Sequence, residues 1–130
     1  MKIHHIGYLV SDIKLAIKQF EEIGGTLKDP VVFDKNRLVD IAFIEMGGQY
    51  LLELVSPHEE SKAVGKALRR LKNTPYHLCF ECNNDLDEEI RAFVSKGCMV
   101  VEEPSIAVAI QNRRVAFLYS AEIGLFELVE

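Results

Sequence analysis

The chain has 130 residues, of which 48% are hydrophobic and 27% charged, and its net charge is −5. This balance is typical of a globular protein with a core of its own and excludes a disordered or fibrous one. The acidic charge disfavours nucleic acid and anionic membranes as partners, and no apolar run approaches the roughly 18 residues that a membrane-spanning helix needs.

The first half of the chain predicts a strand, a helix and three further strands. Apolar residues alternate along Ile3–Val10, which is typical of a strand. Asp12 can cap a helix that the pair Gly24-Gly25 ends. The apolar stripe of this helix consists of Ile13, Ala16, Ile17 and Phe20. The strand-like stretches that follow cover residues 26 to 33, 38 to 46 and 49 to 55.

A linking helix is predicted over residues 60 to 72, and Asn73-Thr74-Pro75 ends it because proline cannot continue a helix. Its apolar stripe consists of Val64, Ala67, Leu68 and Leu71. Its basic residues are Lys62, Lys66, Arg69 and Arg70. We interpret them as a solvated face that complements the negative end of the helix; a phosphorylated ligand is the alternative.

The second half predicts the same order of elements. A strand covers Tyr76–Cys82, Asp85 precedes a helix, and Gly97 ends that helix. The helix stripe consists of Leu86, Ile90, Phe93 and Val94. The final strands are expected over residues 98 to 103, 106 to 119 (with an interruption) and 124 to 129.

The cysteines indicate a reducing compartment rather than a disulfide framework. There are three, Cys79, Cys82 and Cys98, which is an odd number, and we expect a cytoplasmic protein. Cys79 and Cys82 spell C-x-x-C, a spacing used for zinc or redox chemistry. Residues three apart on a strand face opposite sides, so we interpret this pair as structural.

The two halves are related by an internal repeat. Residues 41 to 55 align without a gap on residues 115 to 129, and six of the fifteen positions are identical. Upstream, His5 aligns with His77 at a slightly different offset. We therefore expect an α+β fold, with one domain over residues 1–130 built from two βαβββ modules, about 1–57 and 75–130.

The repeat also nominates a metal site. His5 and His77 lie in the first strand of each module, and Glu53 and Glu127 lie in the last strand, flanked by apolar residues. Each glutamate alone could point outward from a half-exposed strand, but a buried carboxylate must be paired or bound to metal. The recurrence of both pairs favours a site for divalent Zn, Co, Ni, Mn or Fe with positions left for substrate.

These segments resemble the vicinal oxygen chelate superfamily, which includes glyoxalase, bleomycin-resistance and dioxygenase proteins, and within it the methylmalonyl-CoA epimerase branch. The similar segments are His5–Asp12, Leu51–Pro57, His77–Glu81, Arg114–Leu118 and Gly124–Glu130. The resemblance implies a curved eight-stranded mixed sheet that encloses a metal held by His5, Glu53, His77 and Glu127. It also implies an isomerase or lyase that stabilises an enolate during proton transfer.

The resemblance implies further site residues as well. Asp40 and Glu127 are the candidate catalytic carboxylates, and Arg113 and Arg114 are candidates for gripping a substrate carboxylate or phosphate. A surface aspartate near a turn is the alternative for Asp40, and a cap on the sheet edge is the alternative for the arginines. His4 and His58 have no mate in the repeat, so we leave them out of the site.

Three segments depart from the epimerase pattern. Ile106–Asn112 stands where a glycine-rich loop is usual, Thr74-Pro75-Tyr76 replaces a glycine and a second histidine before His77, and Tyr119-Ser120 replaces a His-Pro pair. The substrate is therefore expected to be an acyl-CoA, a hemithioacetal or a related carbonyl compound, and the chain a homodimer. The alternatives are a glyoxalase I-like lyase, a non-catalytic ligand-binding or antibiotic-binding protein and, less favoured, a dioxygenase.

Overall fold

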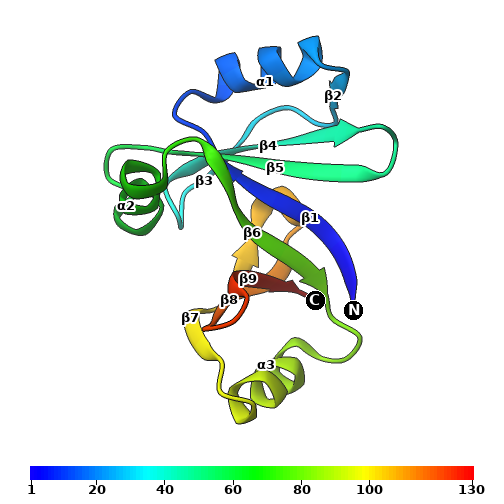
Figure 1. Cartoon of the computed structure of the whole chain (residues 1–130), viewed down its shortest axis with the longest axis vertical. Coiled ribbons are helices and arrows are strands. Elements are labelled where there is room, and N and C mark those ends of the chain that lie inside the picture. The colour runs from blue at the N-terminus through cyan, green and yellow to red at the C-terminus, as the bar shows by residue number, and fades with distance from the viewer. The chain divides into compact units, whose positions relative to one another are not determined.

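The computed structural model describes residues 1–130, which form nine strands, three α-helices and one short 3-10 helix (Figure 1). In chain order the elements are β1 (Lys2–Leu9), α1 (Ile13–Glu22), β2 (Gly25–Leu27), β3 (Val32–Asp34), β4 (Val39–Met46), β5 (Tyr50–Pro57), α2 (Lys62–Leu71), β6 (Thr74–Glu81), α3 (Leu86–Ser95), β7 (Met99–Ala107), η1 (Val108–Ile110), β8 (Arg113–Ser120) and β9 (Gly124–Val129). No helix combines the length and apolar character needed to cross a membrane.

The strands form a mixed sheet in the order β2-β4-β5-β1-β6-β9-β8-β7, with β3 paired to β4. Two neighbouring pairs, β1 with β5 and β6 with β9, are parallel, whereas β4 with β5 and β8 with β9 are antiparallel. The predicted α+β class and the βαβββ modules are confirmed. The sheet has nine strands rather than eight, because β2 and β3 replace the single strand expected over residues 26 to 33. Pro30, which has no N–H to donate to a ladder, lies between them.

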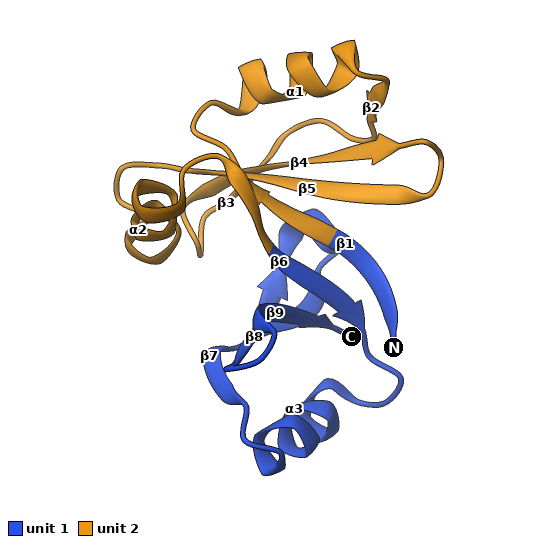
Figure 2. Cartoon of the chain, in the orientation of Figure 1, with its two compact units in different colours: residues 1–5, 77–130 blue, residues 6–76 orange.

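The chain divides into two compact units, which Figure 2 colours separately. Unit 1 consists of residues 1–5 and 77–130, and unit 2 of residues 6–76. The division falls inside β1 and inside β6, so each of these strands contributes residues to both units.

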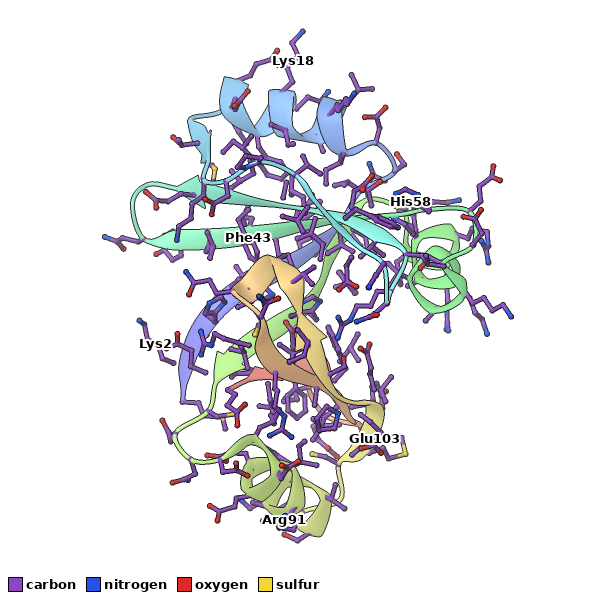
Figure 3. The ribbon with its side chains drawn as sticks, turned by 180° about the vertical axis from the view of Figure 1, so that it is seen from behind. Lys2, Lys18, Phe43, His58, Arg91 and Glu103 are labelled. Atoms are coloured by element: carbon purple, nitrogen blue, oxygen red, sulfur yellow. The ribbon has the colours of Figure 1, made fainter.

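In unit 2, α1 packs on one face of the strands. The buried cluster there consists of Val10, Ile13, Ala42, Ile44 and Leu54. Asp12 accepts a hydrogen bond from the backbone N–H of Leu15, as expected of the helix cap. Lys18, on the exposed side of α1, points away from the sheet (Figure 3). The amphipathic stripe read from the sequence is therefore the packing face of this helix.

Unit 1 repeats this arrangement with α3. Its buried cluster consists of Leu86, Ala116, Leu118, Phe126 and Leu128. The carboxylate of Asp85 accepts from the backbone N–H groups of Asp87 and Glu88, which confirms the second cap. The glycines that end α1 and α3, Gly24 and Gly97, have φ values of +96° and +95°, a backbone region that favours glycine.

The duplication extends to the register of the strands. In unit 2, Glu53 of β5 is opposite Gly7 of β1 and Phe43 of β4. In unit 1, Glu127 of β9 has Cys79 of β6 and Phe117 of β8 as the corresponding neighbours. The backbone N–H of Val10 donates to Val55, and that of Cys82 donates to Val129 in the same way. Each module therefore places its last-strand glutamate at an equivalent point in its ladder.

The second module differs from the prediction along β7. This strand continues through Pro104 to Ala107, with register shifts against β8 between Val100 and Glu102 and between Glu102 and Ser105. The interruption predicted within residues 106 to 119 is confirmed: it consists of η1 and of Gln111 and Asn112, whose φ values are positive. A bulge accommodates the proline that a regular ladder would exclude.

Candidate metal centre

Three side chains of unit 1 converge on one point. The Nε2 atoms of His5 and His77 lie 3.2 Å apart. The Oε2 atom of Glu127 lies 3.1 Å from Nε2 of His5 and 3.4 Å from Nε2 of His77. All three residues are buried, with at most 4% of each exposed. The structure thus brings together three of the four predicted ligands within this unit.

Strand alternation explains why these side chains meet. His77 and Cys79 are two residues apart on β6, so they share a face, and Cys79 is opposite Glu127 on β9. Phe126 and Leu128, on either side of Glu127, face α3 as part of the core cluster. β1, which carries His5, is the neighbour of β6 in the sheet (Figure 1). One face of unit 1 is therefore apolar and covered by α3, while the other carries the polar triad.

The charge state of Glu127 follows from its neighbours. Burial on its own would raise the pKa of this carboxyl group, but hydrogen bonds from His5 and His77, together with their charges, outweigh burial and lower the pKa below its usual value. Glu127 is therefore ionised at neutral pH. A buried anion between two imidazoles is the arrangement that a cation would complete.

The geometry fits a divalent ion. A transition-metal ion binds imidazole nitrogen and carboxylate oxygen at about 2.0–2.2 Å, so two neighbouring ligand atoms lie roughly 3.0–3.4 Å apart. The three separations observed here, 3.1, 3.2 and 3.4 Å, fall in that range. Mixed imidazole and carboxylate donors suit Zn, Co, Ni, Mn or Fe.

Glu53, the fourth predicted ligand, lies in unit 2. Its side chain is on β5 and only 5% of the residue is exposed. It shares a face of its sheet with Phe43, the residue opposite it on β4. Its neighbours Leu52 and Leu54 point to the other face, where they pack in the α1 core. The alternation predicted from the sequence therefore holds for both glutamates.

Asp40, a candidate catalytic carboxylate, is not brought to the face that carries Glu53. Asp40 is opposite Ser56 in the β4–β5 ladder, whereas Glu53 is three residues before Ser56, and residues three apart on a strand face opposite sides. The carboxylate of Asp40 instead lies 3.1 Å from Nε2 of His58, whose ring contacts Phe33. Figure 3 shows His58 at the end of the sheet near α2. His58 makes a contact that the repeat did not indicate: its Nε2 lies beside the carboxylate of Asp40.

The two arginines predicted to bind substrate contact acidic and backbone groups of unit 1. The guanidinium of Arg114 binds both carboxylate oxygens of Asp87, at 3.1 and 2.9 Å, and lies 3.4 Å from Glu130. The hydrogen bonds to Asp87 raise the pKa of Arg114. The Nε atom of Arg113 donates to the carbonyl of Glu130, and its Nη1 lies 3.9 Å from Glu81. Arg114 thus links β8 to the first turn of α3, and neither arginine joins the triad.

His4 was missed by sequence reasoning. Alternation predicts that it faces away from His5, yet the Nδ1 atoms of these two rings lie 2.8 Å apart. Burial lowers the pKa of His4, and the neighbouring His5 lowers it further. His4, His5 and Cys79 also form a second group of candidate ligand atoms, all within 4.8 Å of one another. The only signal in the sequence was the His-His pair itself.

With this geometry established, the family can be stated. Residues 4–117 match the model of the Glyoxalase/Bleomycin resistance protein/Dioxygenase superfamily. The chain belongs to this superfamily. The predicted resemblance is thereby confirmed, and the match includes His5, Glu53 and His77 but ends before Glu127. No curated protein sequence matches the chain.

Solved structures extend the comparison over nearly the whole chain. The methylmalonyl-CoA epimerase of Mycobacterium tuberculosis is 26% identical with a TM-score of 0.84, covering 98% of this chain and 86% of its own. A Streptomyces coelicolor methylmalonyl-CoA epimerase variant, in complex with 2-nitronate-propionyl-CoA, is 25% identical with a TM-score of 0.85, covering 99% and 93%. A hypothetical protein from Bacillus halodurans is 26% identical with a TM-score of 0.85, also covering 99% and 93%. This superfamily member therefore resembles methylmalonyl-CoA epimerases in fold.

Proposed function

We propose that the chain is a metal-dependent enzyme that moves a proton next to a carbonyl group through an enolate, in the manner of a methylmalonyl-CoA epimerase. The observation that carries the proposal is the convergence of two imidazole nitrogens and one carboxylate oxygen at mutual distances of 3.1–3.4 Å. When bound there, a divalent ion would act as a Lewis acid that stabilises the negative charge on the enolate oxygen.

Glu53 is the fourth ligand in this proposal. Its support is the internal repeat, in which Glu53 is the mate of Glu127. The equivalent register of Glu127 in the other module supports the same role. A divalent ion held by four protein ligands would still be able to bind substrate.

Proton transfer requires a base, and Glu127 is the carboxylate that we assign to it. It is ionised, buried and part of the triad. In this step the substrate C–H bond breaks, the proton goes to the carboxylate, and the electron pair goes to the carbonyl oxygen as an enolate.

The position of Asp40 supports a second candidate function. Epimerisation returns the proton to the opposite face of the carbon, which calls for a second acid, whereas a shift of a proton between adjacent carbons can use one base. Asp40, the predicted second carboxylate, lies on the face opposite Glu53 and pairs with His58. This observation favours a glyoxalase I-like lyase as the alternative. The epimerase structures with acyl-CoA ligands favour an acyl-CoA substrate.

The experiment that tests the proposal combines metal analysis with isotope exchange. The protein is purified without added metal, its bound ions are measured, and deuterium wash-in at the α-carbon is followed for methylmalonyl-CoA and for the hemithioacetal of methylglyoxal and glutathione. Wash-in that depends on the ion and falls in Glu127→Gln supports the proposal. Glu21→Gln, on the exposed side of α1, is the matched control. If both Glu127→Gln and His77→Ala bind metal as tightly as the parent, the proposal is contradicted.

The assembly and location of the chain remain predictions that accompany this function. We expect a homodimer and a cytoplasmic protein, with a small molecule as the only substrate partner. Light scattering of the purified chain, at a concentration well above that used for activity, measures the first. A mass equal to one chain would overturn it.

A further inference from the structure

A second carboxylate lies on the face of unit 1 that carries the triad. Phe117 of β8 is opposite Glu127 of β9, and Glu102 of β7 is opposite Phe117 on its other side. Residues directly opposite each other in a ladder point to the same face of the sheet. Glu102, Phe117 and Glu127 therefore form one row across three strands of unit 1 (Figure 2). Glu102 is half-buried, so it is open to a small molecule above the row.

Two irregularities of β7 bring Glu102 to this face. Val100 is opposite Leu118, which packs in the α3 core, so regular alternation would turn Glu102 toward α3 as well. The register shift after Val100 reverses the face. A second shift, between Glu102 and Ser105, brings Ser105 to the same face, where its hydroxyl donates a hydrogen bond to Oε1 of Glu102 at 3.2 Å. The bulged strand thus aims a carboxylate and its donor at the triad face together.

The first module has no counterpart of this carboxylate. At the offset that matches Phe43 with Phe117, Glu102 corresponds to Lys28. The backbone N–H of Lys28 donates to the carbonyl of Phe43, so this position is paired with the phenylalanine in both modules. The fold therefore does not require an acid here, since the first module pairs in the same way with a lysine.

The spacing of the row suits a reacting carbon held between two carboxylates. Neighbouring strands are about 4.8 Å apart, so the backbones of Glu102 and Glu127 are separated by roughly 10 Å. A carbon with a reacting oxygen at about 3–3.5 Å on each side needs these oxygens roughly 6–7 Å apart. Two glutamate side chains reach that separation by leaning toward each other above Phe117. The ring of Phe117 meets that of His77 edge to face, with 5.1 Å between centroids, and so forms an apolar floor beside the triad.

We propose that Glu102 is the second acid–base residue of the reaction, acting on the face of the α-carbon opposite Glu127. This inference rests on the proposed function. After Glu127 has taken the α-proton, the O–H bond of protonated Glu102 breaks, its proton goes to the other face of the carbon, and the electron pair of the enolate forms the new C–H bond. In the reverse direction Glu102 removes the proton and Glu127 returns the one that it holds. Exchange with solvent restores the starting protonation of both carboxyl groups.

Isotope exchange with the separate epimers tests this role. The protein loaded with Co²⁺ is incubated in D₂O with (2R)- or (2S)-methylmalonyl-CoA, and both the α-deuterium and the epimer formed are measured. The parent should exchange and interconvert both epimers. Glu102→Gln should lower the epimerisation rate by about 10²- to 10⁴-fold, yet retain exchange of the epimer whose α-proton faces Glu127. Glu103→Gln, at the exposed next position on β7, is the matched control and should equal the parent.

Co²⁺ affinity is a second readout, which does not depend on turnover. Glu102→Gln should bind Co²⁺ within about 3-fold of the parent, because Glu102 is not a ligand in the proposed site. Binding weaker by roughly 10-fold or more would place Glu102 in the metal centre and overturn the inference. Equal loss of exchange for both epimers, or epimerisation as fast as in the parent, would also overturn it. A parent that exchanges neither epimer would remove the proposed function and this inference with it, whereas a contrary result confined to Glu102→Gln leaves the proposed function standing.

Discussion

The two modules are alike in the side chains whose position depends on backbone pairing between strands. They differ in the contacts that exposed side chains make with one another. Glu53 and Glu127 have equivalent cross-strand neighbours, and Asp12 and Asp85 both cap helices. By contrast, Asp40 pairs with His58, whereas its mate Arg114 binds Asp87. Backbone pairing has therefore kept the register of a duplicated unit, while surface contacts of each copy have diverged. The ligand positions belong to the part that is shared.

The largest effect is expected from matched deletions in the two cores. Leu54 and Leu128 are mates in the repeat and both are fully buried, one in each cluster. Leu54→Ala and Leu128→Ala should each lower the free energy of unfolding by about 2–5 kcal/mol, because each removes transfer energy and leaves a cavity. Urea unfolding of the two variants provides the measurement. Losses that differ by more than about 2 kcal/mol would show that the modules are not energetically equivalent.

Removal of each glutamate tests the equivalence at the site. Glu127→Gln should weaken Co²⁺ binding by more than the roughly 10- to 100-fold cost of losing an outer-shell partner, because a charged ligand is lost. Glu53→Gln should weaken it by a similar factor if both modules contribute a ligand. Isothermal titration with Co²⁺ measures both, with Glu21→Gln as the control. An unchanged affinity in Glu53→Gln would confine the site to unit 1.

The helix caps should show a smaller and graded difference. Asp85 accepts from two backbone N–H groups, while Asp12 accepts from one. Asp12→Ala should lower the free energy of unfolding by about 1 kcal/mol, and Asp85→Ala by somewhat more, up to about 2 kcal/mol. Thermal unfolding of both variants at neutral pH measures this order. A larger loss for Asp12→Ala would mean that the number of accepted hydrogen bonds does not set the strength of the cap.

The smallest effect on stability is expected at Cys82, the position of the second module that is equivalent to Val10 in the first. Burial raises the pKa of the Cys82 thiol from 9.0 to about 11. A group whose pKa is raised on folding contributes stability that is full below its unfolded pKa and is lost as pH rises through the folded one. Cys82→Val should change stability by less than about 1.5 kcal/mol near pH 8.

The pH dependence of this pair gives the sharper measurement. Between pH 9.0 and about 11 the parent should lose stability relative to Cys82→Val, because the unfolded thiol ionises before the folded one. Urea unfolding at about pH 8 and about pH 10.5 compares the two proteins. Parallel curves for parent and variant would show that the thiol ionises equally in both states.

The shared features were accessible from the sequence because they depend on periodicity. The alternation around Glu53 and Glu127 and the aspartate caps are local patterns, and each of them occurs in both modules of the repeat. Asp40 was proposed from the family resemblance alone, and the face on which its side chain lies depends on the β4–β5 register. That register is set by the short turn of the β4–β5 hairpin, in which Met46 is paired with Tyr50.

The contacts between long side chains were not accessible in this way. The approach of His4 to His5 depends on the rotation of two rings, and the pairing of Arg114 with Asp87 depends on where α3 starts above the sheet. Neither contact produces a periodic pattern or a fixed spacing in the sequence. The effect of a proline also differs between the modules. Pro30 separates β2 from β3, whereas Pro104 lies in a bulge within the single strand β7.

The pairing of Glu127 with Cys79 and Phe117 gives the triad a use as a sensor of correct folding. Slippage of β9 by one residue against its neighbours would turn Glu127 toward α3 and bring Phe126 or Leu128 to the polar face. Such a mispaired chain would keep its strands and helices but lose one of its three convergent donors. Capture of Co²⁺ during refolding would therefore count only molecules whose sheet has reached the native alignment.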